Sequence, residues 1–165
     1  SLPVIDSVQK KNTGRPKKVL ETILPLLGDI QGKTITFLGM TYKQGATTLE
    51  HSLPLKVAKQ MASLGATIHV YDPLIEKELT QSKETKDFSV FSDPYKAVVN
   101  AHAVICITPW QEIKELDFKK MAESMQTPKI LFDARNFFLS DEIRLTQAGM
   151  MYIGIGRKIG IKVAV

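Results

Sequence analysis

Four segments contain the residues whose types could do chemistry, and each segment follows a β-prone run. They are Gly39-Met-Thr-Tyr-Lys-Gln-Gly45, Tyr71-Asp-Pro73, Thr108-Pro-Trp110 and Asp133-Ala-Arg-Asn136. The side chains of Lys43 and Arg135 suit a phosphate, because each carries positive charge and several N–H donors. The aromatic side chains beside them could pack on a base or a sugar. Strand ends that are polar only because they meet solvent would explain the same residues, so both interpretations stay open.

The apolar pattern supplies the elements that must position these segments. It predicts strands over residues 34–38, 67–71, 88–91, 101–107, 129–132 and 150–155. It predicts helices over 4–11, 16–27, 54–64, 118–125 and 140–148, with a further helix start at Pro94. Thr13-Gly14 is expected to interrupt the first two helices, and residues 74–87 to form a polar surface excursion with a helical turn.

Strands and helices alternate almost throughout, which indicates an α/β fold. Right-handed crossovers make an open, mostly parallel, doubly wound (Rossmann-like) sheet with helices on both faces the economical arrangement. In such a sheet ligands bind beyond the carboxyl ends of the strands. The four polar segments are therefore expected at one edge of the sheet.

Composition narrows the class of protein. The chain has 165 residues, 44% apolar and 24% charged, which is typical of one globular domain. A single cysteine excludes an internal disulfide and favours a reducing, cytoplasmic compartment. No apolar run is long enough to span a membrane. The net charge of +5 is concentrated near the N-terminus; a solvated helix face explains this basic run, and attraction to an anion is the alternative. Nucleic acid is not expected, because no aromatic residues interleave with the basic run.

Three functional interpretations are disfavoured by the residues: a dinucleotide site, a nucleophilic cysteine and a metal site. A dinucleotide fingerprint needs G-x-G-x-x-G directly after the first strand, whereas Gly39 and Gly45 enclose the bulky pair Tyr42 and Lys43. NAD binding by this chain alone is therefore not expected. Cys106 lies inside an apolar strand, where a thiol is usually inert. The three histidines lack metal-ligand spacing, so no metal site is expected.

Five segments in order resemble the C-terminal, UDP-sugar-binding domain of the UDP-glucose/GDP-mannose dehydrogenase family. They are residues 33–43, 65–73, 93–110, 132–136 and 149–157, with Tyr-Asp-Pro and Asp-Ala-Arg-Asn as the most recognisable endings. The resemblance implies that residues 1–31 are the end of an inter-domain linker helix and residues 32–165 the nucleotide-sugar-binding domain.

The resemblance also implies an activity for the parent protein. Family enzymes oxidise the C6 alcohol of a nucleotide sugar to a carboxylate with two NAD⁺, through a catalytic cysteine upstream of this domain. We therefore expect no catalytic residue in this chain and no activity of the chain alone. A homo-oligomeric parent, with NAD held mainly by another domain, is also implied.

Carried over position by position, the resemblance assigns substrate binding to Tyr42, Lys43, Arg135 and Asn12. Glu50 stands where the family has an arginine on the NAD side of the cleft, which leaves the cofactor-binding residues unassigned. Two alternatives stay open: a non-catalytic nucleotide or nucleotide-sugar binding module, and an independent Rossmann-type NAD protein.

Overall fold

The computed structural model describes residues 3–157, with side chains from residue 14 onward. Its strands are β1 (Thr34–Leu38), β2 (Thr67–Tyr71), β3 (Ser89–Val90), β4 (Ala103–Cys106), β5 (Ile130–Asp133) and β6 (Met151–Gly154). Its helices are α1 (Pro3–Leu27), α2 (Leu53–Ser63), α3 (Glu76–Gln81), α4 (Pro94–Ala97), α5 (Gln111–Lys114), α6 (Phe118–Ser124) and α7 (Glu142–Gln147). Two 3₁₀ turns, η1 (Lys83–Thr85) and η2 (Leu139–Asp141), complete the described elements.

The six strands form one sheet in the order β3-β2-β1-β4-β5-β6, and every neighbouring pair is parallel. The doubly wound α/β prediction is confirmed, and the described sheet is parallel throughout. The register pairs Leu38 with Tyr71 and Cys106 with Asp133. The carboxyl ends of β1, β2, β4 and β5 therefore lie along one edge, as the polar segments require.

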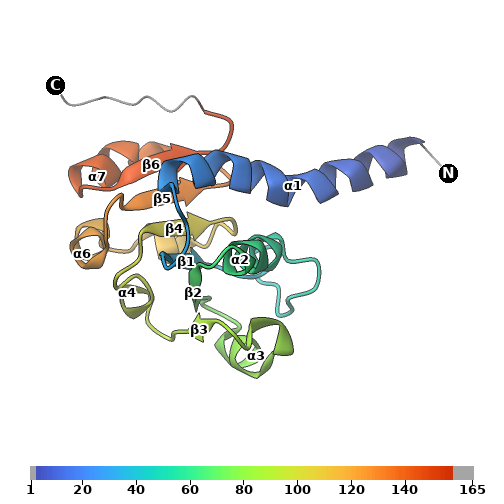
Figure 1. Cartoon of the computed structure of the whole chain (residues 1–165), viewed down its shortest axis with the longest axis horizontal. Coiled ribbons are helices and arrows are strands. Elements are labelled where there is room, and N and C mark those ends of the chain that lie inside the picture. Colours follow the sequence, from blue (N-terminus) through green and yellow to red (C-terminus); the bar gives the residue numbers. More distant parts are fainter. Residues whose placement is uncertain (1–2, 158–165) are drawn as a thin grey trace.

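Helices cover both faces of the sheet (Figure 1). Side chains alternate along each strand, so Ile35 and Phe37 face one layer while Leu38 faces the other. The first layer contains the apolar sides of α1, α2 and α3, and the second contains those of α5, α6 and α7. The strands β1, β4 and β5 are buried on both faces, which explains their nearly continuous apolar sequences.

The expected break between two N-terminal helices is wrong, because α1 runs without interruption from Pro3 to Leu27. Gly14 costs a helix only about 1 kcal/mol, and a proline such as Pro16 removes one helical hydrogen bond, so neither change forbids helix. Val19, Ile23 and Leu27 recur every four residues and are buried in the core. This packing anchors the C-terminal part of α1, while its N-terminal part extends away from the sheet (Figure 1).

Helix starts follow local capping chemistry. The side chain of Ser52 accepts a hydrogen bond from the backbone N–H of Leu55 and begins α2, with Pro54 in the first turn. Asp93 caps α4 in the same manner, as its Asp-Pro sequence predicts. The short helix α5 was not expected, because its four residues, which follow Trp110, are too few to show a period.

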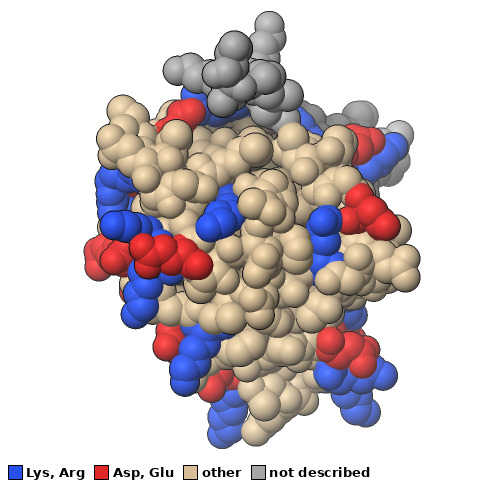
Figure 2. All heavy atoms as spheres, turned by 60° about the vertical axis from the view of Figure 1, so that its left-hand side comes forward, with Lys and Arg blue, Asp and Glu red and all other residues tan. Residues whose placement is uncertain are grey.

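The surface carries charges of both signs. On the face drawn in Figure 2, basic and acidic side chains are interspersed around a broad area that carries neither. None of the described helices is long and apolar enough to cross a membrane.

Candidate functional site

The loops that follow β1 and β4 meet at the centre of the carboxyl edge. In the observed strand order the chain turns in opposite directions after these two strands; we call the region outside their carboxyl ends, where doubly wound sheets bind ligands, the crevice. Gly39 has φ +91°, and a Cβ atom there would lie 3.0 Å from Cδ1 of Trp110 and 3.1 Å from Cβ of Thr108. The close approach of the two loops therefore requires glycine at this position.

Tyr42 and Lys43 lie in the loop after β1 with exposed side chains; that of Tyr42 is 53% exposed. The backbone before them is fixed on both sides. The Met40 N–H donates to Asp72 at 2.7 Å, and the Ser52 hydroxyl donates to the Met40 carbonyl at 2.5 Å. Two exposed ligand-type side chains thus project from a firmly held backbone.

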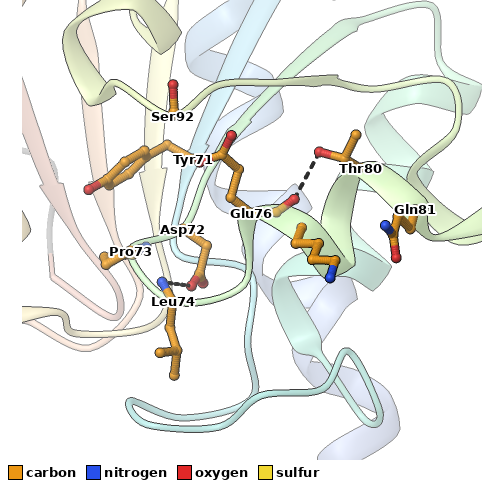
Figure 3. A pocket seen from close by; sticks show the side chains of 9 residues that line it. Tyr71, Asp72, Pro73, Leu74, Glu76, Thr80, Gln81 and Ser92 are labelled. Carbon is orange, nitrogen blue, oxygen red and sulfur yellow. Dashed lines mark hydrogen bonds between the residues drawn. The ribbon is translucent and has the colours of Figure 1, made fainter.

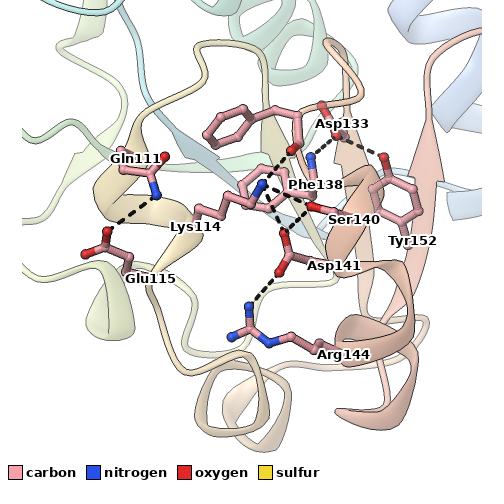
Figure 4. A network of polar contacts seen from close by, with 10 residues as sticks. Gln111, Lys114, Glu115, Asp133, Phe138, Ser140, Asp141, Arg144 and Tyr152 are labelled. Carbon is pink, nitrogen blue, oxygen red and sulfur yellow. Dashed lines mark hydrogen bonds and ion pairs between the residues drawn. The ribbon is translucent and has the colours of Figure 1, made fainter.

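Arg135 lies in the loop after β5, and its side chain is also exposed. The buried carboxylate of Asp133 holds this loop. It accepts hydrogen bonds from the N–H of Phe138 at 2.8 Å and the hydroxyl of Tyr152 at 3.0 Å (Figure 4), and from the N–H of Arg135 at 2.9 Å. Burial and the neighbouring Asp133 raise the pKa of Tyr152, so its hydroxyl remains a donor.

A second network braces the same loop from outside. The Lys114 ammonium lies 3.2 Å from the Phe137 carbonyl and 3.3 Å from the Asp141 carboxylate, which also accepts from Arg144 at 2.6 Å (Figure 4). Burial alone would raise the pKa of Asp141, but the hydrogen bonds from Arg144 and Lys114 outweigh it and hold that pKa below its usual value. The loop that carries Arg135 is therefore fastened to α5 and α7.

The two cations flank the crevice. Strand β4 lies between β1 and β5, so Lys43 and Arg135 leave the edge two strands apart, about 10 Å between strand axes. Within the described part of the chain, neither side chain forms an ion pair. Glu50, farther along the loop after β1, is exposed and lies 3.4 Å from His51. Two exposed cations at one edge of the sheet can attract an anion.

Other sequence candidates have structural duties. Both carboxylate oxygens of Asp72 accept backbone N–H groups, from Met40 on one side and from Leu74 and Ile75 on the other. With a side chain that is buried as well, Asp72 serves to hold the backbone at the ends of β1 and β2. Asn12 belongs to helix α1, and the structure describes side chains only from residue 14 onward.

Cys106 is buried in β4 and faces the second apolar layer. Burial raises the pKa of its thiol well above the ordinary value, and the nearby Asp133 raises it further. The thiol is protonated at neutral pH, which does not suit a nucleophile. Among residues 14–157, no cluster of His, Cys, Asp and Glu side chains has the arrangement of a metal site.

An open pocket of about 610 Å³ lies beside the end of β2, against α3 (Figure 3). Asp72 and Glu76 are among its lining residues. Burial raises the pKa of the lining residue Tyr71, and the carboxylates of Asp72 and Glu112 raise it further. Lys77 lines the same pocket, which therefore carries charges of both signs.

Sequence reasoning missed the residues that hold the site. Thr108 and Ser52 bind the backbone before Tyr42, but their partners lie 67 and 12 residues away in the chain. A helix-cap signal at Ser52, directly before the Leu-Pro start of α2, was the one local sign.

The strand order, with its switch point between β1 and β4, defines a doubly wound, Rossmann-like class of α/β protein. Within that class, residues 36–140 match the UDP binding domain of the UDP-glucose/GDP-mannose dehydrogenase family. The chain belongs to this family.

Individual relatives agree. The chain is 31% identical over 167 residues to UDP-glucose 6-dehydrogenase of Drosophila melanogaster, a match that covers 94% of this chain and 34% of that protein. It is 35% identical over 130 residues to UDP-glucose 6-dehydrogenase of Rhizobium meliloti (strain 1021), covering 79% of this chain and 29% of that protein. A UDP-glucose dehydrogenase structure from the archaeon Pyrobaculum islandicum superimposes with a TM-score of 0.73 at 19% identity over 93% of this chain and 32% of that chain, which shows the shared fold. The chain thus spans about a third of the length of these relatives.

Proposed function

We propose that the carboxyl edge of this sheet binds the nucleotide of a UDP-sugar, with UDP-glucose as the preferred ligand. One observation carries the proposal: the exposed cations Lys43 and Arg135 flank the crevice on backbone that buried carboxylates hold in place. A diphosphate is an anion of matching charge. The family match and the relatives named as UDP-glucose 6-dehydrogenases support uridine as the nucleoside.

Each side chain has a role in this proposal. The ammonium of Lys43 neutralises phosphate charge as a point cation, and the planar guanidinium of Arg135 donates two parallel hydrogen bonds. The ring of Tyr42 offers an apolar surface to a base or sugar. Asn12 belongs to the proposal as a contact from α1.

The residues of this chain do not fit NAD. The G-x-G-x-x-G sequence that lets a dinucleotide's pyrophosphate approach the backbone is absent after β1, where Tyr42 and Lys43 lie between Gly39 and Gly45, and the carboxylate of Asp72 accepts backbone N–H groups. We therefore propose that this chain serves substrate binding in a longer, NAD-dependent, cytoplasmic and homo-oligomeric nucleotide-sugar 6-dehydrogenase of polysaccharide biosynthesis. NAD and the catalytic cysteine would belong to another part of that enzyme, so the chain alone is expected to be inactive.

Glu50 favours a second candidate, a nucleotide-sugar binding module without catalysis. Its carboxylate is exposed in the loop after β1, where it would repel a second pyrophosphate brought to this side of the crevice. Reconstitution with an NAD domain from a relative separates the two candidates, because only the first predicts NADH formation from UDP-glucose.

An NMR titration of the ¹⁵N-labelled chain tests binding directly. With UDP-glucose, we expect amide shifts clustered at Tyr42, Lys43 and Arg135, and with NAD⁺ no such cluster. Shifts with NAD⁺ alone would favour an independent dinucleotide-binding protein. The absence of shifts with either ligand would contradict a nucleotide-sugar site on this chain.

A further inference from the structure

Two buried threonine hydroxyls link the end of β4 to the backbone of Lys43. Thr108, which is 1% exposed, donates from its hydroxyl to the Thr41 carbonyl at 2.5 Å. Thr41, which is fully buried, donates from its own hydroxyl to the Lys43 carbonyl at 3.0 Å. The chain of bonds crosses the β1/β4 crevice and ends on the residue proposed to neutralise phosphate.

We propose that Thr108 is a positioning residue for the anion site, because its hydroxyl fixes the loop from which Tyr42 and Lys43 project. The inference rests on the proposed UDP-sugar function for its consequence in binding, although the ordering of the loop itself does not depend on it. Thr108 contacts no ligand in this account and acts only through Thr41.

The packing around Thr108 explains why a hydroxyl is needed at this position. Gly39 brings the two loops so close that a Cβ atom there would lie 3.1 Å from Cβ of Thr108. Apolar contact sets this separation but has no direction, whereas a hydrogen bond also fixes the orientation of the Thr41 peptide. Rotation of that peptide would change the direction in which the side chains of Tyr42 and Lys43 leave the loop.

Side chains other than Thr108 bind the backbone of Met40, the residue before Thr41. Asp72 and Ser52 bind the backbone N–H and carbonyl of Met40, and neither reaches Thr41. Beyond it, the Ala46 N–H donates to the Lys43 carbonyl at 3.1 Å, which closes a turn within the loop. In the described residues, Thr108 thus provides the tie between this turn and the neighbouring strand.

The sequence offers a matched control. Thr36 in β1 is also fully buried, and its hydroxyl donates to the Ala97 carbonyl at 2.6 Å. Thr36→Val removes the same kind of bond, from a buried threonine hydroxyl to a backbone carbonyl, but within β1 and away from the crevice. A purely structural role for Thr108 predicts that Thr36→Val and Thr108→Val have equal consequences.

The first readout uses the ligand-free chain. In Thr108→Val we expect the amides of residues 41–45 to shift, to lose ¹⁵N order and to exchange faster with solvent. In Thr108→Ser, which keeps the hydroxyl, and in Thr36→Val these amides should resemble wild type. Unchanged order and exchange in folded Thr108→Val would overturn the proposal, whatever the chain binds.

The second readout is affinity for UDP-glucose by calorimetry. Thr108→Val should bind about 3- to 10-fold more weakly than wild type, with Thr108→Ser recovering most of the loss. Thr36→Val should bind UDP-glucose with wild-type affinity, even if its urea midpoint falls as much as that of Thr108→Val. Loosening of residues 41–45 with unchanged affinity would refute the link to the site, whereas a wild-type chain that binds no UDP-glucose would instead refute the proposed function.

Should Thr108→Val fail to fold, Thr41→Val provides the second test, because it removes the hydroxyl bond to Lys43 and keeps the carbonyl that Thr108 binds. Order at Lys43 should fall in this variant too. Order that remains at the wild-type level would contradict the proposal.

Discussion

Arg135 is the residue whose chemistry is most specific in the proposed site. Its guanidinium is exposed, while its backbone is fixed by the buried Asp133, so the side chain can change without disturbing the fold. We predict that Arg135→Ala weakens UDP-glucose binding by roughly 1–3 kcal/mol, because a charge-assisted bidentate contact is lost. Arg135→Lys should recover only part of this, since an ammonium lacks the planar fork.

Arg15→Ala is the matched control for this variant. Arg15 is exposed on α1, and its removal changes the net charge equally. Calorimetric titrations at one salt concentration should show wild-type affinity for Arg15→Ala. An equal loss in both variants would mean that overall charge, not Arg135, attracts the ligand.

His102 links folding to pH at the opposite edge of the sheet. Its Nδ1 accepts a hydrogen bond from the Thr34 N–H at 3.2 Å, and burial together with the positive charge of Lys33 lowers its pKa below the ordinary value of 6.5. Above pH 6.5 the histidine is neutral in both states and costs nothing. As the pH falls below 6.5 the unfolded chain takes up the proton first, so the free energy of unfolding decreases.

The variant His102→Asn keeps an acceptor oxygen near the position of Nδ1 and cannot titrate. We predict that lowering the pH from 7.5 to 5.5 reduces the urea midpoint of wild type more than that of His102→Asn. Parallel pH profiles for the two proteins would remove His102 as the cause.

At the scale of elements, the brace between α5 and α7 holds the loop that carries Arg135. Lys114→Met removes the ammonium that the Phe137 carbonyl and the Asp141 carboxylate share, and leaves Arg144 as the remaining partner of that carboxylate. We predict that the free energy of unfolding falls by about 1–3 kcal/mol, the usual contribution of a hydrogen bond to a charged group.

Urea denaturation of Lys114→Met and of Lys119→Met makes the comparison. Lys119 is exposed on α6, so its substitution should stay within about 0.5 kcal/mol of wild type. A wild-type midpoint for Lys114→Met would show that the network adds nothing to stability.

The sequence predicted the strands well because β1, β4 and β5 are buried on both faces and read as apolar runs. It misplaced the N-terminal elements: Gly14 and Pro16 indicated a break, but a continuous α1 forms, anchored by Val19, Ile23 and Leu27. The local helix propensity of these residues favours a break, whereas packing of α1 on residues far along the chain favours a continuous helix. A short stretch of sequence does not contain those distant residues.

Some residues of the proposed site were also predictable from the sequence, and others were not. The exposed residues Tyr42, Lys43 and Arg135 were predictable as strand-end chemistry, and the structure places them at one edge. Their supports were not predictable, because the bond from Thr108 to Thr41 exists only once β1 and β4 are neighbours. Thr108 is recognisable as a strand-end residue, but its place in the sequence does not indicate which carbonyl its hydroxyl binds.

At the scale of the molecule, the carboxyl edge is electrostatically divided. Asp72, Glu76 and Lys77 line the open pocket at the β2 end with charges of both signs, whereas the exposed cations Lys43 and Arg135 follow β1 and β5. A diphosphate is therefore expected beside Lys43 and Arg135 and not in the pocket at β2. The face drawn in Figure 2 carries charges of both signs, and the absence of nucleic-acid binding stays a prediction.

The difference in affinity between UDP and uridine tests this account most directly, because the two ligands differ only in the diphosphate. We predict that the wild-type chain binds UDP at least about 10-fold more tightly than uridine, and that Lys43→Gln brings the two affinities closer while uridine binding stays unchanged. Lys56→Gln, which alters an exposed lysine of α2, should leave the ratio as in wild type. Equal affinities of the wild-type chain for UDP and uridine, or a ratio that Lys43→Gln does not change, would contradict a diphosphate site at this edge.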